Sequence, residues 1–288
     1  MKLGYYPGCS LEGTAREFGI SVRKSCALLG IEIRDVEDWN CCGATAAHNT
    51  NHLLSIALPG RVLALAEQQG FDELLSPCAA CSNRLISAQK EMAENEALRK
   101  EVVEVIEIPY AGTVKVLNYL QLMLKYGLEN LERKVVRKLE NFKIACYYGC
   151  LLVRPPKVVQ FDDPENPQSM DNIVRALGAE AIDWEYKVEC CGGGFTVSDP
   201  TLVETLSHDI LENAEAEGAN AISVSCPLCH ANLDMKQSAI NARFRERRKL
   251  PIYYVSELVA LACGATPEEA GINKHFVNSY GLIRQVPG

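Results

Sequence analysis

The sequence lacks several features that would place it in common classes. It has no uninterrupted apolar run near 18 residues, and its first residues do not form a basic segment followed by an apolar stretch, so neither a membrane span nor a secretory signal is expected. The net charge is −8, and the one basic cluster, residues 243–249, is short, so no nucleic-acid partner is expected. These absences predict a cytoplasmic protein.

Two cofactor motifs are also missing. No Gly-x-Gly-x-x-Gly follows a predicted strand, so the chain is not expected to bind a flavin or a dinucleotide in the usual way. No Cys-x-x-Cys-x-x-Cys run occurs, which argues against a ferredoxin-type cubane cluster. Any electrons that the chain uses should therefore come from another protein.

Cysteine, in contrast, is abundant. The 288 residues include 13 cysteines, and in the cytosol such a number cannot be a disulfide framework because the reducing pool keeps thiols reduced. Metal or redox chemistry is the default interpretation. With 48% apolar residues the chain can bury one large core or two smaller ones, and two domains are expected.

An internal repeat indicates the architecture. Three segments of the first half recur in the same order in the second half. The pairs are "GYYPGCS" (4–10) with "CYYGCLL" (146–152), "NCCGATAAH" (40–48) with "ECCGGGFTV" (189–197), and "SPCAACSNRL" (76–85) with "SCPLCHANL" (225–233). We expect two pseudo-symmetric units, residues 1–135 and 136–288.

Each unit reads as short strands that alternate with helices, with cysteines on the loops between them. Such alternation predicts an α/β fold in which each unit has a short parallel sheet flanked by helices. Apolar residues at helical spacing predict one buried helix face, formed by Phe18, Val22, Cys26 and Leu29. The next helix is expected to break at Pro59-Gly60.

Each unit contributes five cysteines to the repeated pattern. They are Cys9, Cys41, Cys42, Cys78 and Cys81 in the first unit, and Cys150, Cys190, Cys191, Cys226 and Cys229 in the second. Five is one more than a tetrahedral zinc site binds. Adjacent cysteines suit zinc poorly because consecutive side chains of an extended segment point to opposite sides. They suit a polynuclear centre better, where each can reach a different iron.

The blander interpretation is that each Cys-x-x-Cys is only a pair of buried thiols. The recurrence of the whole five-cysteine pattern argues against it. Three cysteines lie outside the pattern, namely Cys26, Cys146 and Cys263. They fall on predicted helix faces and on a predicted strand, and we expect them to be packing residues.

The paired cysteine pattern, the "YYPGCS" start and the "DDPENP" loop (162–167) resemble the HdrB family of heterodisulfide reductase subunits over essentially the whole chain. A single Cys-Cys-Gly (CCG) domain also occurs in unusual succinate dehydrogenases, glycolate oxidases and lactate-utilisation proteins, so two intact copies are the more specific signal. The resemblance implies that each five-cysteine set binds a noncubane [4Fe-4S] cluster. All ten ligand positions are present, although the second unit has one residue fewer between its paired cysteines and Cys226.

By the same resemblance, the chain is expected to be the catalytic subunit of a disulfide oxidoreductase. The substrate would be the mixed disulfide of coenzyme M and coenzyme B, cleaved to two thiols between the two clusters during methanogenesis. The implied partners are the small iron–sulfur protein and the flavoprotein of a heterodisulfide reductase complex. The flavoprotein can bifurcate electrons with hydrogenase or formate dehydrogenase subunits.

Candidate side chains around this chemistry follow from position. His48 and His230 come shortly after cysteine motifs and are candidates for proton donors. Because coenzyme M carries a sulfonate and coenzyme B a phosphate, the pocket should contain cations, and Arg16, Arg154 and Lys157 lie near the first cysteine of each unit.

Two alternatives remain open at this point. A bacterial or archaeal relative with the same clusters could act on another disulfide or on a sulfur carrier. A non-catalytic protein could transfer electrons or serve as a scaffold with zinc in one or both units.

Overall fold

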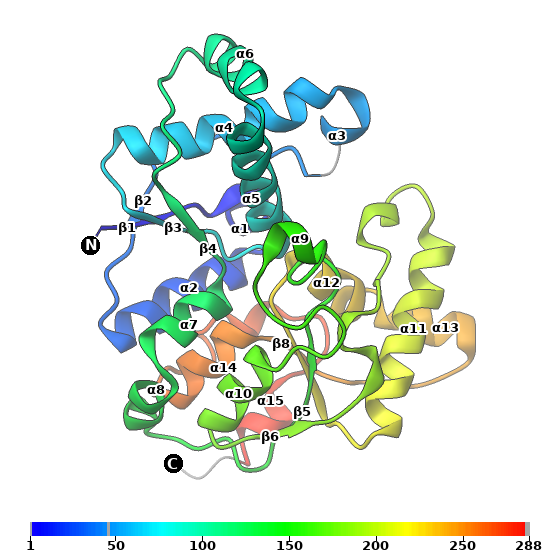
Figure 1. Cartoon of the computed structure of the whole chain (residues 1–288). Coiled ribbons are helices and arrows are strands. Elements are labelled where there is room, and N and C mark those ends of the chain that lie inside the picture. The colour runs from blue at the N-terminus through cyan, green and yellow to red at the C-terminus, as the bar shows by residue number, and fades with distance from the viewer. Residues whose placement is uncertain (1, 45–46, 286–288) are drawn as a thin grey trace.

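Two four-stranded parallel sheets form the framework of the computed structural model, which describes residues 2–44 and 47–285 apart from the side chain of His48 (Figure 1). The first sheet has the order β2-β1-β3-β4 and comprises β1 (Leu3–Tyr5), β2 (Arg34–Asp35), β3 (Glu73–Leu75) and β4 (Lys115–Leu117). The second has the order β6-β5-β7-β8 and comprises β5 (Lys143–Tyr147), β6 (Glu180–Ile182), β7 (Ala221–Val224) and β8 (Ile252–Tyr254). The same strand order in both sheets confirms the predicted α/β class with two repeated units.

Helices connect the strands on both faces. Those of the first half are α1 (Gly8–Glu12), α2 (Arg16–Leu29), α3 (Ala47–Thr50), α4 (His52–Gln68), α5 (Ala79–Glu94), α6 (Glu96–Ile106), α7 (Tyr119–Tyr126) and α8 (Leu128–Lys134). Those of the second half are α9 (Pro156–Val159), α10 (Ser169–Ala176), η1 (Glu185–Val188), η2 (Gly193–Phe195), α11 (Pro200–Ala216), α12 (Pro227–His230), the π-helix η3 (Ala231–Met235), α13 (Gln237–Phe244), α14 (Val255–Ala262), η4 (Ile272–Lys274) and α15 (Tyr280–Ile283). Among the described residues, no helix has the length and apolarity needed to span a bilayer.

Helix α2 forms where the apolar spacing predicts it. Phe18, Val22 and Cys26 are fully buried, and Leu29 is nearly so, which confirms the predicted face. The helix ends at Gly30, whose left-handed backbone conformation (φ +74°) terminates the turn.

The predicted break at Pro59-Gly60 is wrong, because α4 runs through both residues. A Cβ atom on Gly60 would lie only 3.1 Å from Cγ1 of Val102 in α6. The glycine therefore allows close packing of α4 on α6, and this tertiary contact outweighs the backbone hydrogen bond that Pro59 cannot donate.

The two units exchange their last helices. Helix α14, which follows the second sheet, packs along α2 of the first unit, and α7 and α8, which follow the first sheet, pack against α10 of the second unit (Figure 1). One continuous apolar core results. The unit boundary at residues 135 and 136 stays a prediction, because helices from each side of this boundary pack against the other unit.

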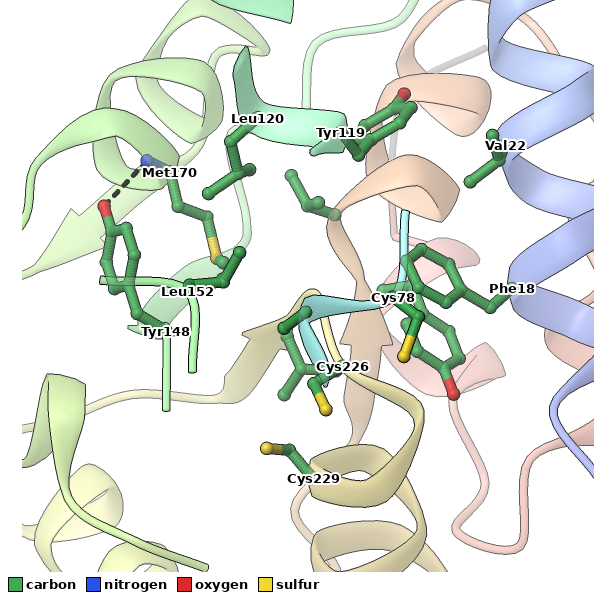
Figure 2. Close-up of a cluster of buried hydrophobic side chains, with 14 of the residues drawn as sticks. Phe18, Val22, Cys78, Tyr119, Leu120, Tyr148, Leu152, Met170, Cys226 and Cys229 are labelled. Carbon is green, nitrogen blue, oxygen red and sulfur yellow. Dashed lines mark hydrogen bonds between the residues drawn. The ribbon is translucent and has the colours of Figure 1, made fainter. Parts of the chain in front are cut away.

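Aromatic and hydroxyl side chains fill the interface between the units. The rings of Phe18 and Tyr254 stack with their centroids 4.2 Å apart, and the hydroxyls of Ser21 and Ser256 lie 2.6 Å apart. Figure 2 shows Phe18 of α2 in this buried cluster. The interface holds the two sheets in a fixed relation, because these side chains have no room to move without opening a cavity.

Replacing Phe18 with Ala should destabilise both units together. We expect Phe18→Ala to lower the free energy of unfolding by about 3–5 kcal/mol, with a single urea-induced transition followed by far-UV circular dichroism. Val105→Ala is the matched control, because Val105 is 57% exposed and its truncation should change little. Two separate transitions, with only the first shifted, would show that the units do not share a core.

Candidate metal centre

The ten patterned cysteines lie beyond the carboxyl ends of the parallel strands. In the first unit, Cys9 follows β1, Cys41 and Cys42 follow β2, and Cys78 and Cys81 follow β3. The second unit repeats this placement after β5, β6 and β7. Because the carboxyl ends of parallel strands share one edge of a sheet, loops far apart in sequence converge there.

The sulfur atoms of the first set are close together. The Sγ atoms of Cys9 and Cys41 are 3.5 Å apart, and those of Cys42 and Cys81 are 3.3 Å apart. Two thiolates bound to one metal at about 2.3 Å with a tetrahedral angle are about 3.8 Å apart. The observed separations are therefore close to those of sulfurs that share a metal ion.

The second set has the same arrangement. The Sγ atoms of Cys191 and Cys229 are 3.6 Å apart, and the interaction with Cys190 raises the pKa of Cys150. All five cysteines of this set line a cavity of about 70 Å³, together with Tyr147, Tyr148, Leu151, Gly193, Gly194, Leu228 and Ala79 of the first unit. The donor set and the space among the sulfurs fit a polynuclear thiolate-bound centre.

The two sets meet at the equivalent cysteines Cys78 and Cys226. Their side chains interact electrostatically across the unit interface, and Figure 2 shows both, with Cys229, at this border. The contact with Cys226 raises the pKa of Cys78 well above its usual value. The interactions with Cys229 and Cys78 lower the pKa of Cys226 well below its usual value. The two candidate centres are thus neighbours.

Crowding determines the ionisation of the cysteines. Interactions with the neighbouring sulfurs of Cys41 and Cys81 lower the pKa of Cys42 to about 3, and the interaction with Cys42 raises the pKa of Cys41. In the second unit, donation from Cys150 lowers the pKa of Cys190 to about 6. Neighbouring thiolates repel one another, so all five sulfurs of a set can ionise together only beside a strong positive charge such as bound metal.

A pair of tyrosines fixes the loops that carry the adjacent cysteines. The Tyr6 hydroxyl donates to the Asn40 carbonyl at 2.9 Å, and the Tyr147 hydroxyl donates to the Glu189 carbonyl at 2.6 Å. Each carbonyl belongs to the residue before the paired cysteines. These tyrosines were not predicted as site residues, although their equivalence in "GYYPGCS" and "CYYGCLL" is a signal that could have revealed them.

Two equivalent glycines allow sulfur to approach the backbone. A Cβ atom would lie 2.9 Å from Sγ of Cys81 at Gly8 and 3.1 Å from Sγ of Cys229 at Gly149. Both glycines have positive φ values, +69° and +63°. Any larger residue would therefore displace a sulfur and strain the backbone.

Of the two candidate histidines, the structure describes only the side chain of His230. The side chain of His48 lies outside the described residues. His230 is buried, its Nε2 has no hydrogen-bond partner among the described residues, and its ring stacks on Tyr254 with the centroids 4.4 Å apart. Burial lowers the pKa of His230 well below its usual value, and the residue does not line the cavity of the second set. A role for either histidine as proton donor stays a prediction.

The predicted substrate cations lie apart from that cavity. Arg154 forms an ion pair with Glu165 at 2.7 Å, the Arg16 Nε donates to the Glu12 carbonyl, and the Lys157 carbonyl accepts a hydrogen bond from Lys90. None of the three is among the described residues that line the second-unit cavity. Their contact with substrate also stays a prediction.

The cysteines outside the pattern are buried, as expected for packing residues. Burial raises the pKa of Cys26 to about 12 and that of Cys263 to about 11. It raises the pKa of Cys146 well above its usual value. These side chains therefore remain protonated thiols.

Comparisons with known proteins agree with the repeat. The family model described as a cysteine-rich domain (CCG) matches residues 3–86 and 144–234. The chain is 31% identical over 284 residues to the 8-methylmenaquinol:fumarate reductase membrane anchor subunit of Wolinella succinogenes, covering 98% of this chain and 99% of that protein. It is 28% identical over 294 residues to the HdrB subunit of the ferredoxin/F(420)H(2)-dependent CoB-CoM heterodisulfide reductase of Methanosarcina acetivorans, covering 99% and 97%.

Two further matches extend this picture. An HdrB-like protein of Archaeoglobus profundus is 29% identical over 282 residues, covering 94% of each chain. The crystal structure of a hypothetical protein from Helicobacter pylori superposes with a TM-score of 0.76 at 11% identity, covering 96% of this chain and 52% of that one. The structural match supports the fold alone.

Substitution of Gly8 should disturb the first cysteine set selectively. We expect Gly8→Ala to reduce the iron bound per chain after anaerobic purification, because the new Cβ atom would displace the Cys81 sulfur. Gly30→Ala is the matched control, since Gly30 has a similar φ of +74° but open space around a Cβ atom; it should cost only the backbone strain of about 1–2 kcal/mol. Equal iron content in the two variants would contradict this role of Gly8.

Proposed function

The chain belongs to the cysteine-rich CCG-domain family, and on this premise we propose that it is the substrate-reducing iron–sulfur subunit of a heterodisulfide reductase-type complex. Each five-cysteine set would hold one noncubane [4Fe-4S] cluster. The observation that carries the proposal is the meeting of the two sets at Cys78 and Cys226, because adjacent centres suit a two-electron reaction at one substrate. The names of full-length relatives support a reductase role.

Bound clusters would supply one electron each. The residues of the chain would exclude water, leave an open side for the substrate and position the cysteine loops. Buried sulfurs such as Cys42, Cys78 and Cys226 keep water away from the interior side of each centre. Residues Cys9, Cys41 and Cys190 are exposed, so a substrate or an electron donor can approach from that side. Tyr6 and Tyr147 hold the cysteine loops in place.

A finer part of the proposal concerns the substrate and the proteins that donate electrons. We take the disulfide of coenzyme M and coenzyme B as substrate, because relatives that match almost the whole chain are named as HdrB subunits of CoB-CoM heterodisulfide reductases. Electrons would come from the small iron–sulfur protein and the flavoprotein of the same complex in the cytoplasm. Hydrogenase or formate dehydrogenase subunits would be the source in a bifurcating complex.

A second candidate is an electron-transfer subunit that does not itself reduce a disulfide. The full-length match at 31% identity to a subunit of a fumarate reductase complex favours it. The engagement of Arg154 with Glu165 also favours it, because an anionic disulfide would need free cations near the sulfurs.

Metal analysis tests the two centres. The anaerobically purified chain should contain about eight irons, the content of two [4Fe-4S] clusters, and no stoichiometric zinc. Cys81→Ser and Cys229→Ser should each lose about half of the iron, whereas the packing variant Cys26→Ala should keep all of it. Zinc in either set, or full iron in both serine variants, would overturn the assignment.

Turnover separates the two candidate functions. With a reduced viologen dye, the purified complex should reduce the coenzyme M–coenzyme B disulfide to two thiols, measured by thiol titration. Cys26→Ala should retain this activity and Cys229→Ser should lose it. An iron-replete complex that reduces no disulfide but passes electrons between a quinol and fumarate would favour the second candidate.

A further inference from the structure

The two units differ at the third residue after the Cys-x-x-Cys motif. In the first unit the Cys-x-x-Cys motif begins the regular helix α5, and Arg84 follows Cys81 by three residues. In the second unit the equivalent residue is Asn232, which lies in the π-helix η3. A π-turn changes the direction of the side chains that follow it, and such turns are frequent at functional sites.

Asn232 is fully buried and directed at the Cys191 loop. Its Nδ2 donates to the Cys191 carbonyl at 3.0 Å and lies 3.6 Å from the Cys191 Sγ. Its Oδ1 is 3.1 Å from the Thr196 hydroxyl, which can donate to it. The opposite amide orientation would place two acceptor oxygens in contact, so the hydrogen-bond pattern fixes the N–H groups toward Cys191.

The neighbouring contacts hold the same loop. Lys236, the residue after η3, reaches the Thr196 carbonyl with its Nζ at 3.5 Å, and Gly192 donates its N–H to Sγ of Cys190 at 3.3 Å. In the first unit the Tyr6 hydroxyl donates to the Asn40 carbonyl at 2.9 Å, on the residue before the paired cysteines. The amide of Asn232 is thus a side-chain donor to the second of the paired cysteines in the second unit.

We propose that Asn232 is a positioning residue that hydrogen-bonds to the Cys191 thiolate and raises the midpoint potential of the second centre. The proposal rests on the proposed iron–sulfur function. A one-electron reduction adds negative charge to a cluster and its thiolates, and an N–H donor to a ligand sulfur stabilises that charge. Hydrogen bonds to sulfur are among the factors that set cluster potentials.

Redox titration of the full chain, followed by EPR and visible absorption, tests the proposal. Asn232→Leu keeps a similar volume and removes the donor. We expect the midpoint potential of the second centre to shift to a more negative value while the first centre stays unchanged, with iron content preserved. The Cys81→Ser variant, which should retain only the second centre, identifies which signal belongs to it.

Gln237→Leu is the matched control. Gln237 is a buried amide in the same helical run, and its Nε2 donates to the carbonyls of Leu233 and Leu250. Its loss should destabilise the chain and leave both potentials unchanged. Thr196→Val is a milder second variant, since it removes the hydroxyl beside the Asn232 Oδ1 and should give a smaller shift in the same direction.

The possible outcomes are distinct. Unchanged potentials in Asn232→Leu and Thr196→Val, in a chain with both iron–sulfur centres, would overturn the role of Asn232 and leave the proposed function standing. A shift of equal size in Gln237→Leu would also overturn it, because the effect would then be structural. A wild-type chain that binds zinc in place of iron would overturn both proposals.

Discussion

Sulfur atoms crowd together at the edges of the two sheets, and the surrounding structure is arranged around them. Sulfurs only 3.3–3.6 Å apart cannot all be thiolates without a compensating positive charge. The crowding arises because the fold brings three loops of each unit to one sheet edge. The glycines at positions 8 and 149 and the hydroxyls of Tyr6 and Tyr147 then set the sulfur positions within those loops.

The exchange of helices between the units holds the two cysteine sets in a fixed relation. Packing of α14 on α2 and of α7 on α10 makes one core from two sequence repeats. The stacked pair of Phe18 and Tyr254 lies within this shared core, and so does the contact between Cys78 and Cys226. The relative position of the two candidate centres is therefore set by apolar packing.

Pseudo-symmetry in the framework coexists with differences beside the sulfurs. Relatives that match nearly the full chain bear the names of two different reductases, so overall likeness does not decide what reacts here. The residues next to the second set are mainly aromatic, aliphatic or glycine, among them Tyr148, Leu151 and Leu228. The first unit has an arginine, Arg84, at the position equivalent to Asn232.

Much of this protein could be predicted from sequence, because repetition and spacing are local signals. The order of strands and helices, the two units, the buried face of α2 and the five cysteines on the loops of each unit all follow from periodicity and from the recurrence of short motifs. The expected break at Pro59 failed, since close packing of Gly60 against Val102 is a contact between residues far apart in sequence.

The ten sulfurs and the loops that carry them can be read directly from the order of residues. The contacts of Cys78 with Cys226, of Arg154 with Glu165 and of His230 with Tyr254 arise only when the chain folds. Only the fold, too, turned Asn232 toward Cys191. The physical reason is that strand spacing and helix periodicity act within short segments, whereas these contacts depend on how distant helices pack around a shared core.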